Sequence, residues 1–252
     1  TPKPSSAASD VYKRQVGGGM TGAIMALLLK KSKLFNTNDI AWIMPNIKIP
    51  NDLRTTFYNE ESIELLSKLN IWRDLKKSDY TNVKKIQVFG KKNTTPLIWN
   101  NSNKEQNFGA VVKNKVMLDS IFSKLDDIKK FENFVTNTTC DNFERTLYFN
   151  DKHYIKTNLV LCADGKNSQL RKLLLIKTIL KKTGHIAISG FLEQSKDHKL
   201  TATQAFTELG PIGLLPFENK NKINFVLSVE ETKYKNILSK NNPEQYLSLI
   251  HI

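Results

Sequence analysis

Cysteine is scarce in this sequence of 252 residues, which contains two, Cys140 and Cys162. Two cysteines cannot make the disulfide framework of a small secreted domain. Both lie in or beside apolar segments, so the sequence predicts buried free thiols. The four histidines show no metal-ligand spacing with one another or with the cysteines, and we therefore expect no metal site.

Long apolar runs are also missing. The longest run, Ala23 to Leu29, is far shorter than the roughly 20 residues that a helix needs to cross a bilayer. No secretory signal is visible either. These absences argue against a membrane-spanning or secreted protein, and we expect a cytoplasmic location.

Acidic residues are outnumbered, with 24 Asp and Glu against 38 Lys and Arg, which gives a net charge of +14. Such a charge is typical of proteins that bind nucleic acid or anionic membranes. The lysines, however, are spread along the chain in short pairs, without an aromatic-interleaved basic motif. A solvated surface is therefore the simpler interpretation, and we expect no nucleic-acid partner.

Glycine is concentrated at one place. Gly17, Gly19 and Gly22 have the G-x-G-x-x-G spacing and precede an uninterrupted run of apolar helix formers. Such a turn lets the backbone approach a pyrophosphate at the positive end of a helix, and a third glycine allows close helix–sheet packing. Alone, the pattern is weak, because the same glycines can also form a simple tight strand–helix turn.

The residues around this motif depart from a complete dinucleotide fold. Only Val16 is apolar before the glycines, so residues 1–15 are predicted to be a non-native or disordered start that replaces the first strand. Asp39 to Pro45 reads as the second parallel strand. Met44 and Pro45 stand where an Asp or Glu usually holds the ribose hydroxyls.

A second stretch, Leu159 to Arg171, reads as a buried strand, a tight turn at Asp164–Gly165 and a helix start. Together the two stretches resemble the FAD-dependent aromatic monooxygenase family. The resemblance implies that the three glycines of the first motif hold the pyrophosphate, and that Asp164 and Gly165 lie at the ribityl and pyrophosphate region. Cys162 departs from the family pattern, which has glycine or another small residue there.

Two more segments narrow the resemblance to the ubiquinone-biosynthesis hydroxylases, a branch of this family. Asn51 to Trp72 matches one segment of that branch, and Thr201 to Pro216 matches another. By this match Arg54 would lie against the flavin and its phosphates, whereas without it Arg54 is an exposed loop arginine. The third flavin motif of the family is absent, so the chain resembles an N-terminal fragment of a longer enzyme.

The predicted fold class is α/β: an FAD/NAD(P)-binding Rossmann-like parallel sheet with an interleaved antiparallel β substrate domain, which is truncated. Residues 16–80 and 106–180 are assigned to the FAD-binding domain, and 81–105 and 181–252 to the incomplete substrate-binding domain. Within the first domain, Asn133 to Cys140 reads as a parallel strand.

The resemblance implies an enzyme that uses FAD, NAD(P)H and O₂ to hydroxylate a polyprenylated phenol in ubiquinone biosynthesis. No catalytic side chain is assigned, because the flavin supplies the chemistry. A lipid-like substrate implies contact with a membrane surface, peripheral to the inner membrane, or with a ubiquinone-biosynthesis complex. The alternatives are another FAD-dependent oxidoreductase of this fold, a nicotinamide-dependent dehydrogenase that shares only the first motif, and a truncated non-catalytic protein.

Overall fold

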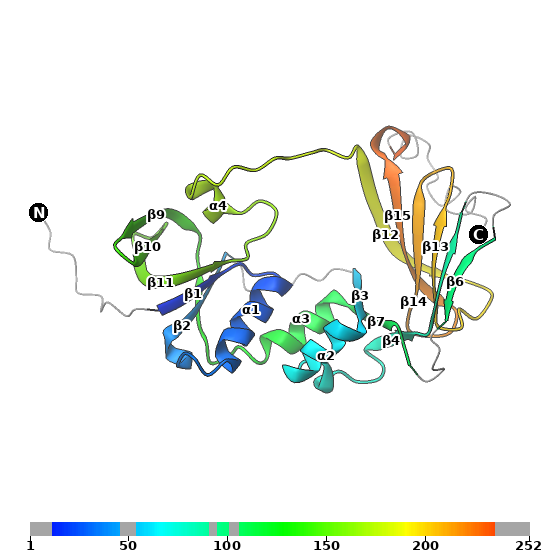
Figure 1. Cartoon of the computed structure of the whole chain (residues 1–252), viewed down its shortest axis with the longest axis horizontal. Helices are drawn as coiled ribbons and strands as arrows, with labels where there is room; N and C mark the ends of the chain where they lie inside the picture. Colours follow the sequence, from blue (N-terminus) through cyan, green and yellow to red (C-terminus); the bar gives the residue numbers. More distant parts are fainter. Residues whose placement is uncertain (1–11, 46–53, 91–94, 101–105, 235–252) are drawn as a thin grey trace, which may run out of the picture. The chain divides into compact units, whose positions relative to one another are not determined.

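The computed structural model describes residues 12–45, 54–90, 95–100 and 106–234 (Figure 1). The helices are α1 (Met20–Lys31), α2 (Glu60–Lys68), α3 (Asn114–Phe122) and α4 (Gln169–Leu173), with short 3-10 turns at Thr37–Asp39 and Trp72–Asp74. The strands are β1 (Tyr12–Val16), β2 (Ile40–Met44), β3 (Thr55–Asn59), β4 (Tyr80–Val83), β5 (Lys85–Phe89), β6 (Leu97–Asn100), β7 (Gly109–Lys113), β8 (Lys129–Glu132), β9 (Val135–Asp141), β10 (Glu144–Phe149), β11 (Tyr154–Cys162), β12 (His185–Glu193), β13 (Thr201–Phe206), β14 (Pro211–Pro216) and β15 (Lys222–Glu230).

The chain divides into two compact units, each made of two chain segments. Thr1–Pro50 and Leu118–Ile179 form the first unit, and Asn51–Met117 and Leu180–Ile252 form the second. The sequence had assigned 54–80 and 106–117 to the FAD-binding domain, whereas these residues fall in the second unit. The functional assignment of each domain stays a prediction.

The first unit is built on a six-stranded sheet in the order β8-β2-β1-β11-β10-β9. The first four strands are parallel, and β10 and β9 extend the sheet as antiparallel neighbours. Its core includes Val16, Ile43, Leu147 and Leu170, which come from three strands and from α4. This arrangement confirms the predicted parallel sheet.

The structure departs from two predictions for this sheet. Tyr12 to Gln15 was expected to form no strand, yet it belongs to β1, which pairs with both β2 and β11. A central position in the sheet supplies hydrogen bonds on both sides, so pairing outweighs the local polar sequence. Asn133 to Cys140 was expected to be a parallel strand. β9 does run in the same direction as β11, but it pairs with β10 in a hairpin, and that pairing is antiparallel.

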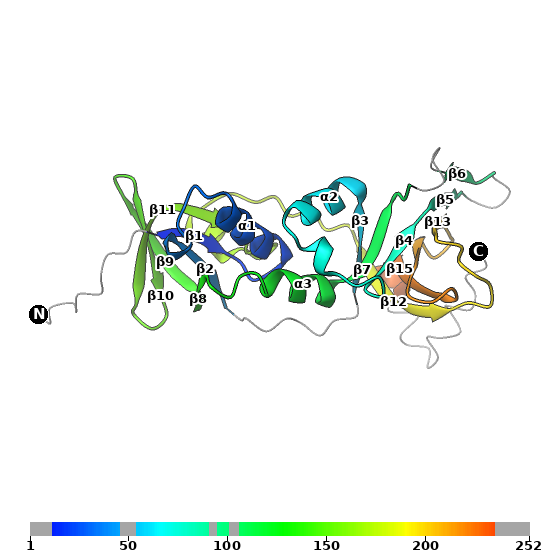
Figure 2. The same ribbon diagram turned by 90° about the horizontal axis from the view of Figure 1, so that it is seen from below.

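The second unit contains a three-stranded sheet, β3-β7-β4, and a six-stranded sheet, β12-β15-β14-β13-β5-β6, which lie beside one another (Figure 2). Val83 and Val111 of the smaller sheet pack with Ala202 of the larger sheet and with Phe217, all nine-tenths or more buried. Pairings within the larger sheet are antiparallel except between β13 and β5. The predicted antiparallel β structure is therefore confirmed for β12 to β15.

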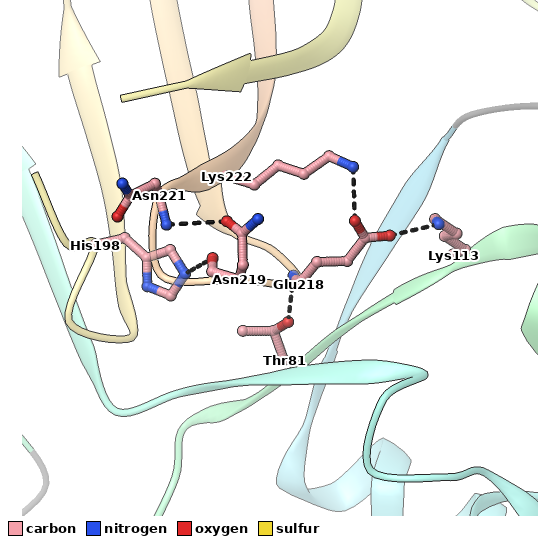
Figure 3. Close-up of polar contacts among 7 residues, drawn as sticks. All are labelled: Thr81, Lys113, His198, Glu218, Asn219, Asn221 and Lys222. Atoms are coloured by element: carbon pink, nitrogen blue, oxygen red, sulfur yellow. Dashed lines mark hydrogen bonds and ion pairs between the residues drawn. The ribbon is translucent and has the colours of Figure 1, made fainter. Parts of the chain in front are cut away.

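The turn between β14 and β15 is held by polar contacts around Glu218 (Figure 3). The Glu218 carboxylate accepts from Lys113 and from Lys222 at 2.6 Å each, while its backbone N–H donates to Thr81 Oγ1 at 2.8 Å. Because Lys113 ends β7 and Thr81 lies in β4, these bonds join the two sheets of the second unit.

Among the described helices, none is long and apolar enough to span a membrane.

Candidate cofactor-binding site

The first glycine of the motif occupies a position that no other residue fits without strain. Gly17 follows β1 directly, with φ at +128°, and a Cβ there would lie 2.1 Å from the carbonyl oxygen of Ala163. The Gly17 N–H donates to Ile43 O at 2.9 Å. The turn is therefore pressed against the end of β11, and glycine is needed for both its φ and its lack of a side chain.

Gly19 lies in a different environment. It is the N-cap residue of α1 at φ −82°, its side-chain position has no atom within 4 Å, and the first turn of α1 contains no acidic residue. An exposed backbone at the positive end of a 12-residue helix is where an anionic group is stabilised. Gly22 is buried within α1, as expected of the glycine that permits close packing.

The structure brings the second motif to this turn. β1 and β11 are adjacent parallel strands with Val16 opposite Cys162, and the Ala163 N–H donates to Val16 O at 2.7 Å. Gly165 has φ +79° and open space around its side-chain position. Both motifs thus meet at the carboxyl ends of neighbouring strands, where open α/β sheets bind their ligands.

Asp164 is fixed by its own loop. Its Oδ1 accepts from Cys162 Sγ at 3.0 Å, and its Oδ2 accepts from the Leu170 N–H at 3.2 Å. Partial burial raises the pKa of the carboxyl, but the hydrogen bonds from Cys162, Ser168 and the backbone outweigh it, so the pKa lies below its usual value. Asp164 is therefore a pre-oriented anion whose oxygens retain further lone pairs for a ligand hydroxyl.

The cysteines are free, but they are not buried as predicted: both are exposed. Cys140 lies on β9, at the edge of its sheet, and Cys162 is the last residue of β11. Desolvation and the hydrogen bond to Asp164 raise the pKa of the Cys162 thiol. The thiol therefore stays protonated and serves as a donor to Asp164 instead of a nucleophile.

Trp42 supports the glycine turn, although the sequence analysis did not identify it. Its ring is fully buried in β2, and its Nε1 donates to Gly17 O at 2.8 Å. Phe122 packs edge-on against it, with the ring centroids 4.9 Å apart. A tryptophan inside an apolar strand was the available signal, because a buried indole N–H needs an acceptor.

The structure also locates two other positions that the sequence singled out, Met44 and Arg54. β2 ends at the fully buried Met44, so the departure at the usual ribose-binding position is real. Arg54 is exposed and belongs to the second unit, where its carbonyl accepts from the Asn114 N–H. The structure therefore unites the glycines with Asp164 and Gly165, and the role of Arg54 toward a flavin stays a prediction.

No protein-family model matches the chain. It is 26% identical over 224 residues to the mitochondrial ubiquinone biosynthesis monooxygenase COQ6 of Caenorhabditis elegans, covering 81% of the chain and 49% of that protein. It is 24% identical to the COQ6 protein of Drosophila melanogaster, covering 81% and 46%. The resemblance to ubiquinone-biosynthesis hydroxylases is thereby confirmed. The chain spans about half the length of these relatives.

Solved structures show the same fold. PqsL, a probable FAD-dependent monooxygenase from Pseudomonas aeruginosa, superposes with a TM-score of 0.74 at 13% identity, covering 91% of the chain and 63% of PqsL. A salicylate hydroxylase gives 0.70 at 17% identity, covering 88% and 56%. The flavin-dependent halogenase CmlS gives 0.67 at 16%, covering 94% and 44%. The predicted α/β fold class is confirmed, and it accommodates more than one flavin chemistry.

Proposed function

We propose that the chain is part of an FAD- and NAD(P)H-dependent monooxygenase that hydroxylates a polyprenylated phenol in ubiquinone biosynthesis. The observation that carries the proposal is the meeting of the Gly17 turn with the Asp164–Gly165 loop at one edge of a parallel sheet. The similarity to COQ6 proteins supports the hydroxylase branch over the other chemistries of the fold.

The residues at this edge fit the adenosine diphosphate part of FAD. The open backbone at Gly19, at the start of α1, would receive the pyrophosphate, while Gly17 keeps the turn against β11 and Gly22 keeps α1 against the sheet. Asp164 and Gly165 would contact the adjoining part of FAD, which carries hydroxyl groups. When bound, the flavin would supply the redox chemistry by which O₂ hydroxylates the phenol at the expense of NAD(P)H.

One face of the larger sheet in the second unit suits an apolar substrate. The strand registers put Leu97, Val226 and Phe206 on the same face, and 61%, 41% and 48% of their surface is exposed. Gly213 lies between them, and the nearest atom to its side-chain position is 3.9 Å away. An exposed, partly apolar face of this kind would gain from covering by a phenol ring with a prenyl chain.

The test is a titration of the chain with FAD, in which the quenching of flavin fluorescence measures binding. Binding is expected, and Gly19→Ala is expected to weaken it because a methyl group would occupy the open position at the start of α1. Gly213→Ala is the matched control, since it adds the same methyl group on the substrate face. Absence of FAD binding together with binding of NADH would instead favour the dehydrogenase alternative.

The remaining parts of the proposal concern the whole protein. Oxygen-dependent hydroxylation by the full-length enzyme would separate it from a halogenase or another oxidoreductase of this fold. A cytoplasmic position peripheral to the inner membrane, with contact to a membrane surface or a ubiquinone-biosynthesis complex, follows from the lipid-like substrate and the +14 charge. Binding to anionic vesicles that weakens as salt is added would support it, and salt-independent binding would contradict it.

A further inference from the structure

Arg54 lies where two elements of the second unit come together. β3 runs antiparallel to β7 with Thr55 opposite Lys113, so Arg54 falls opposite Asn114, the first residue of α3. The Asn114 N–H donates to the carbonyl of Arg54 at 2.9 Å. The backbone of Arg54 is thereby tied to the start of a helix, one residue beyond the end of the strand ladder.

The side chain of Asn114 makes a second bond to the same segment. Thr56 Oγ1 donates to Asn114 Oδ1 at 2.6 Å, and both side chains are partly buried. Asn114 therefore bonds at two points, to the carbonyl of Arg54 just before β3 and to the hydroxyl of Thr56 within β3. Two bonds from one residue restrict the rotation of the intervening peptide planes, which one bond would leave free.

The intervening residue is anchored in a different direction. Thr55 Oγ1 donates to Asn224 Oδ1 at 2.9 Å, and Asn224 Nδ2 donates to Gly190 O at 2.9 Å. Asn224 is 1% exposed and lies in β15, between β12 and β14 of the larger sheet. Because successive strand residues face opposite sides, the bonds of Thr55 and Thr56 hold the start of β3 from both sides of the strand.

We propose that Asn114 and Thr56 are positioning residues that fix the backbone of Arg54. The consequence for FAD rests on the proposed function and on the further prediction that Arg54 lies against the flavin. A pre-set arginine loses less conformational freedom on binding than one on an unrestrained loop. Neither Asn114 nor Thr56 needs to touch the cofactor for this effect.

The test compares Thr56→Val, which removes the hydroxyl, with Thr56→Ser, which keeps it. Thr81→Val is the first control, because the Thr81 hydroxyl also bonds within the second unit, accepting from the Glu218 N–H. Thr56 also hydrogen-bonds the Tyr58 side chain, so Tyr58→Phe, which removes that bond and keeps the bond to Asn114, is a second control with the same expected result. The first readout is hydrogen exchange of the Asn114 amide in the chain without cofactor. Thr56→Val is expected to speed this exchange roughly three- to tenfold, the effect of one net hydrogen bond, whereas Thr56→Ser and Thr81→Val leave it unchanged. Unchanged exchange in Thr56→Val would overturn the proposal.

The second readout is the dissociation constant for FAD in a double-mutant cycle with Arg54→Ala. Thr56→Val is expected to weaken binding roughly three- to tenfold in the Arg54 background and to have no effect in the Arg54→Ala background. Equal weakening in both backgrounds would show that Thr56 acts independently of Arg54 and would overturn the proposal. A wild-type chain that does not bind FAD would refute the proposed function, and amide exchange would then still decide whether Thr56 holds Arg54.

Discussion

Replacing Gly17 by alanine is expected to destabilise the first unit strongly. The added methyl carbon would lie 2.1 Å from Ala163 O, 2.4 Å from Ala163 C and 2.8 Å from Asp164 N. All three are backbone atoms, so no side-chain rotation relieves the overlap. The turn must therefore move away from β11, or the end of β11 must move away from β1.

The magnitude follows from two contributions. A φ of +128° that alanine rarely adopts costs about 1–3 kcal/mol. Separation of the strands also weakens the Ala163 N–H to Val16 O bond and the Gly17 N–H to Ile43 O bond, at about 1 kcal/mol each. The total is about 3–5 kcal/mol, a large share of the roughly 5–15 kcal/mol that stabilises a typical domain.

Thermal unfolding of the cofactor-free chain, followed by circular dichroism, measures this effect. At about 2–4 °C per kcal/mol for a chain of this size, Tm is expected to fall by roughly 6–20 °C. Gly19→Ala is the matched control. Gly19 has φ −82°, and a Cβ added there has no atom within 4 Å, so the Tm of this variant should stay near that of the wild type. If Gly17→Ala also keeps the wild-type Tm, the close approach of the turn to Ala163 is wrong.

Three further predictions concern the supporting contacts. Trp42→Phe removes the indole donor to Gly17 O and should lower the free energy of unfolding by about 0.5–1.5 kcal/mol in a denaturant titration, since it removes a buried hydrogen bond. The bonds from Lys113 and Lys222 lower the pKa of the Glu218 carboxyl. Their contribution to the free energy of unfolding is therefore complete above the unfolded pKa near 4.5 and is lost as the pH falls through the lower folded pKa. Glu218→Gln should reduce Tm at about pH 7 by the equivalent of about 1 kcal/mol or less and should leave Tm unchanged at about pH 2. Gly213→Val should leave Tm near the wild-type value but weaken the binding of a short-chain prenylated phenol in calorimetry, and unchanged affinity would contradict the assignment of this sheet face.

Local sequence predicted the two loops of the candidate site because their function constrains their own residues. The spacing of Gly17, Gly19 and Gly22 is a backbone requirement, and it is visible without knowledge of neighbouring strands. The same holds for the turn at Asp164–Gly165, which follows an apolar strand directly.

Features that depend on distant partners were missed. β1 forms although Tyr12 to Gln15 is polar, because β2 and β11 supply its pairing. The antiparallel pairing of β9 comes from its hairpin with β10, which the composition of β9 alone does not record. The bond between Thr56 and Asn114 joins residues 58 positions apart, so neither side chain indicates the contact by itself.

The two-segment construction of each unit has a consequence for biosynthesis. β1 pairs with β11, so the central ladder of the first unit closes only after the ribosome has made residues up to about Cys162. The chain between Asn51 and Met117 emerges earlier, but β5 of that segment pairs with β13, which is made later still. Such long-range pairing slows folding and exposes unpaired edges to aggregation. The nascent chain is therefore expected to depend on chaperones, because β5 waits for β13 until after the sheet of the first unit has been synthesised.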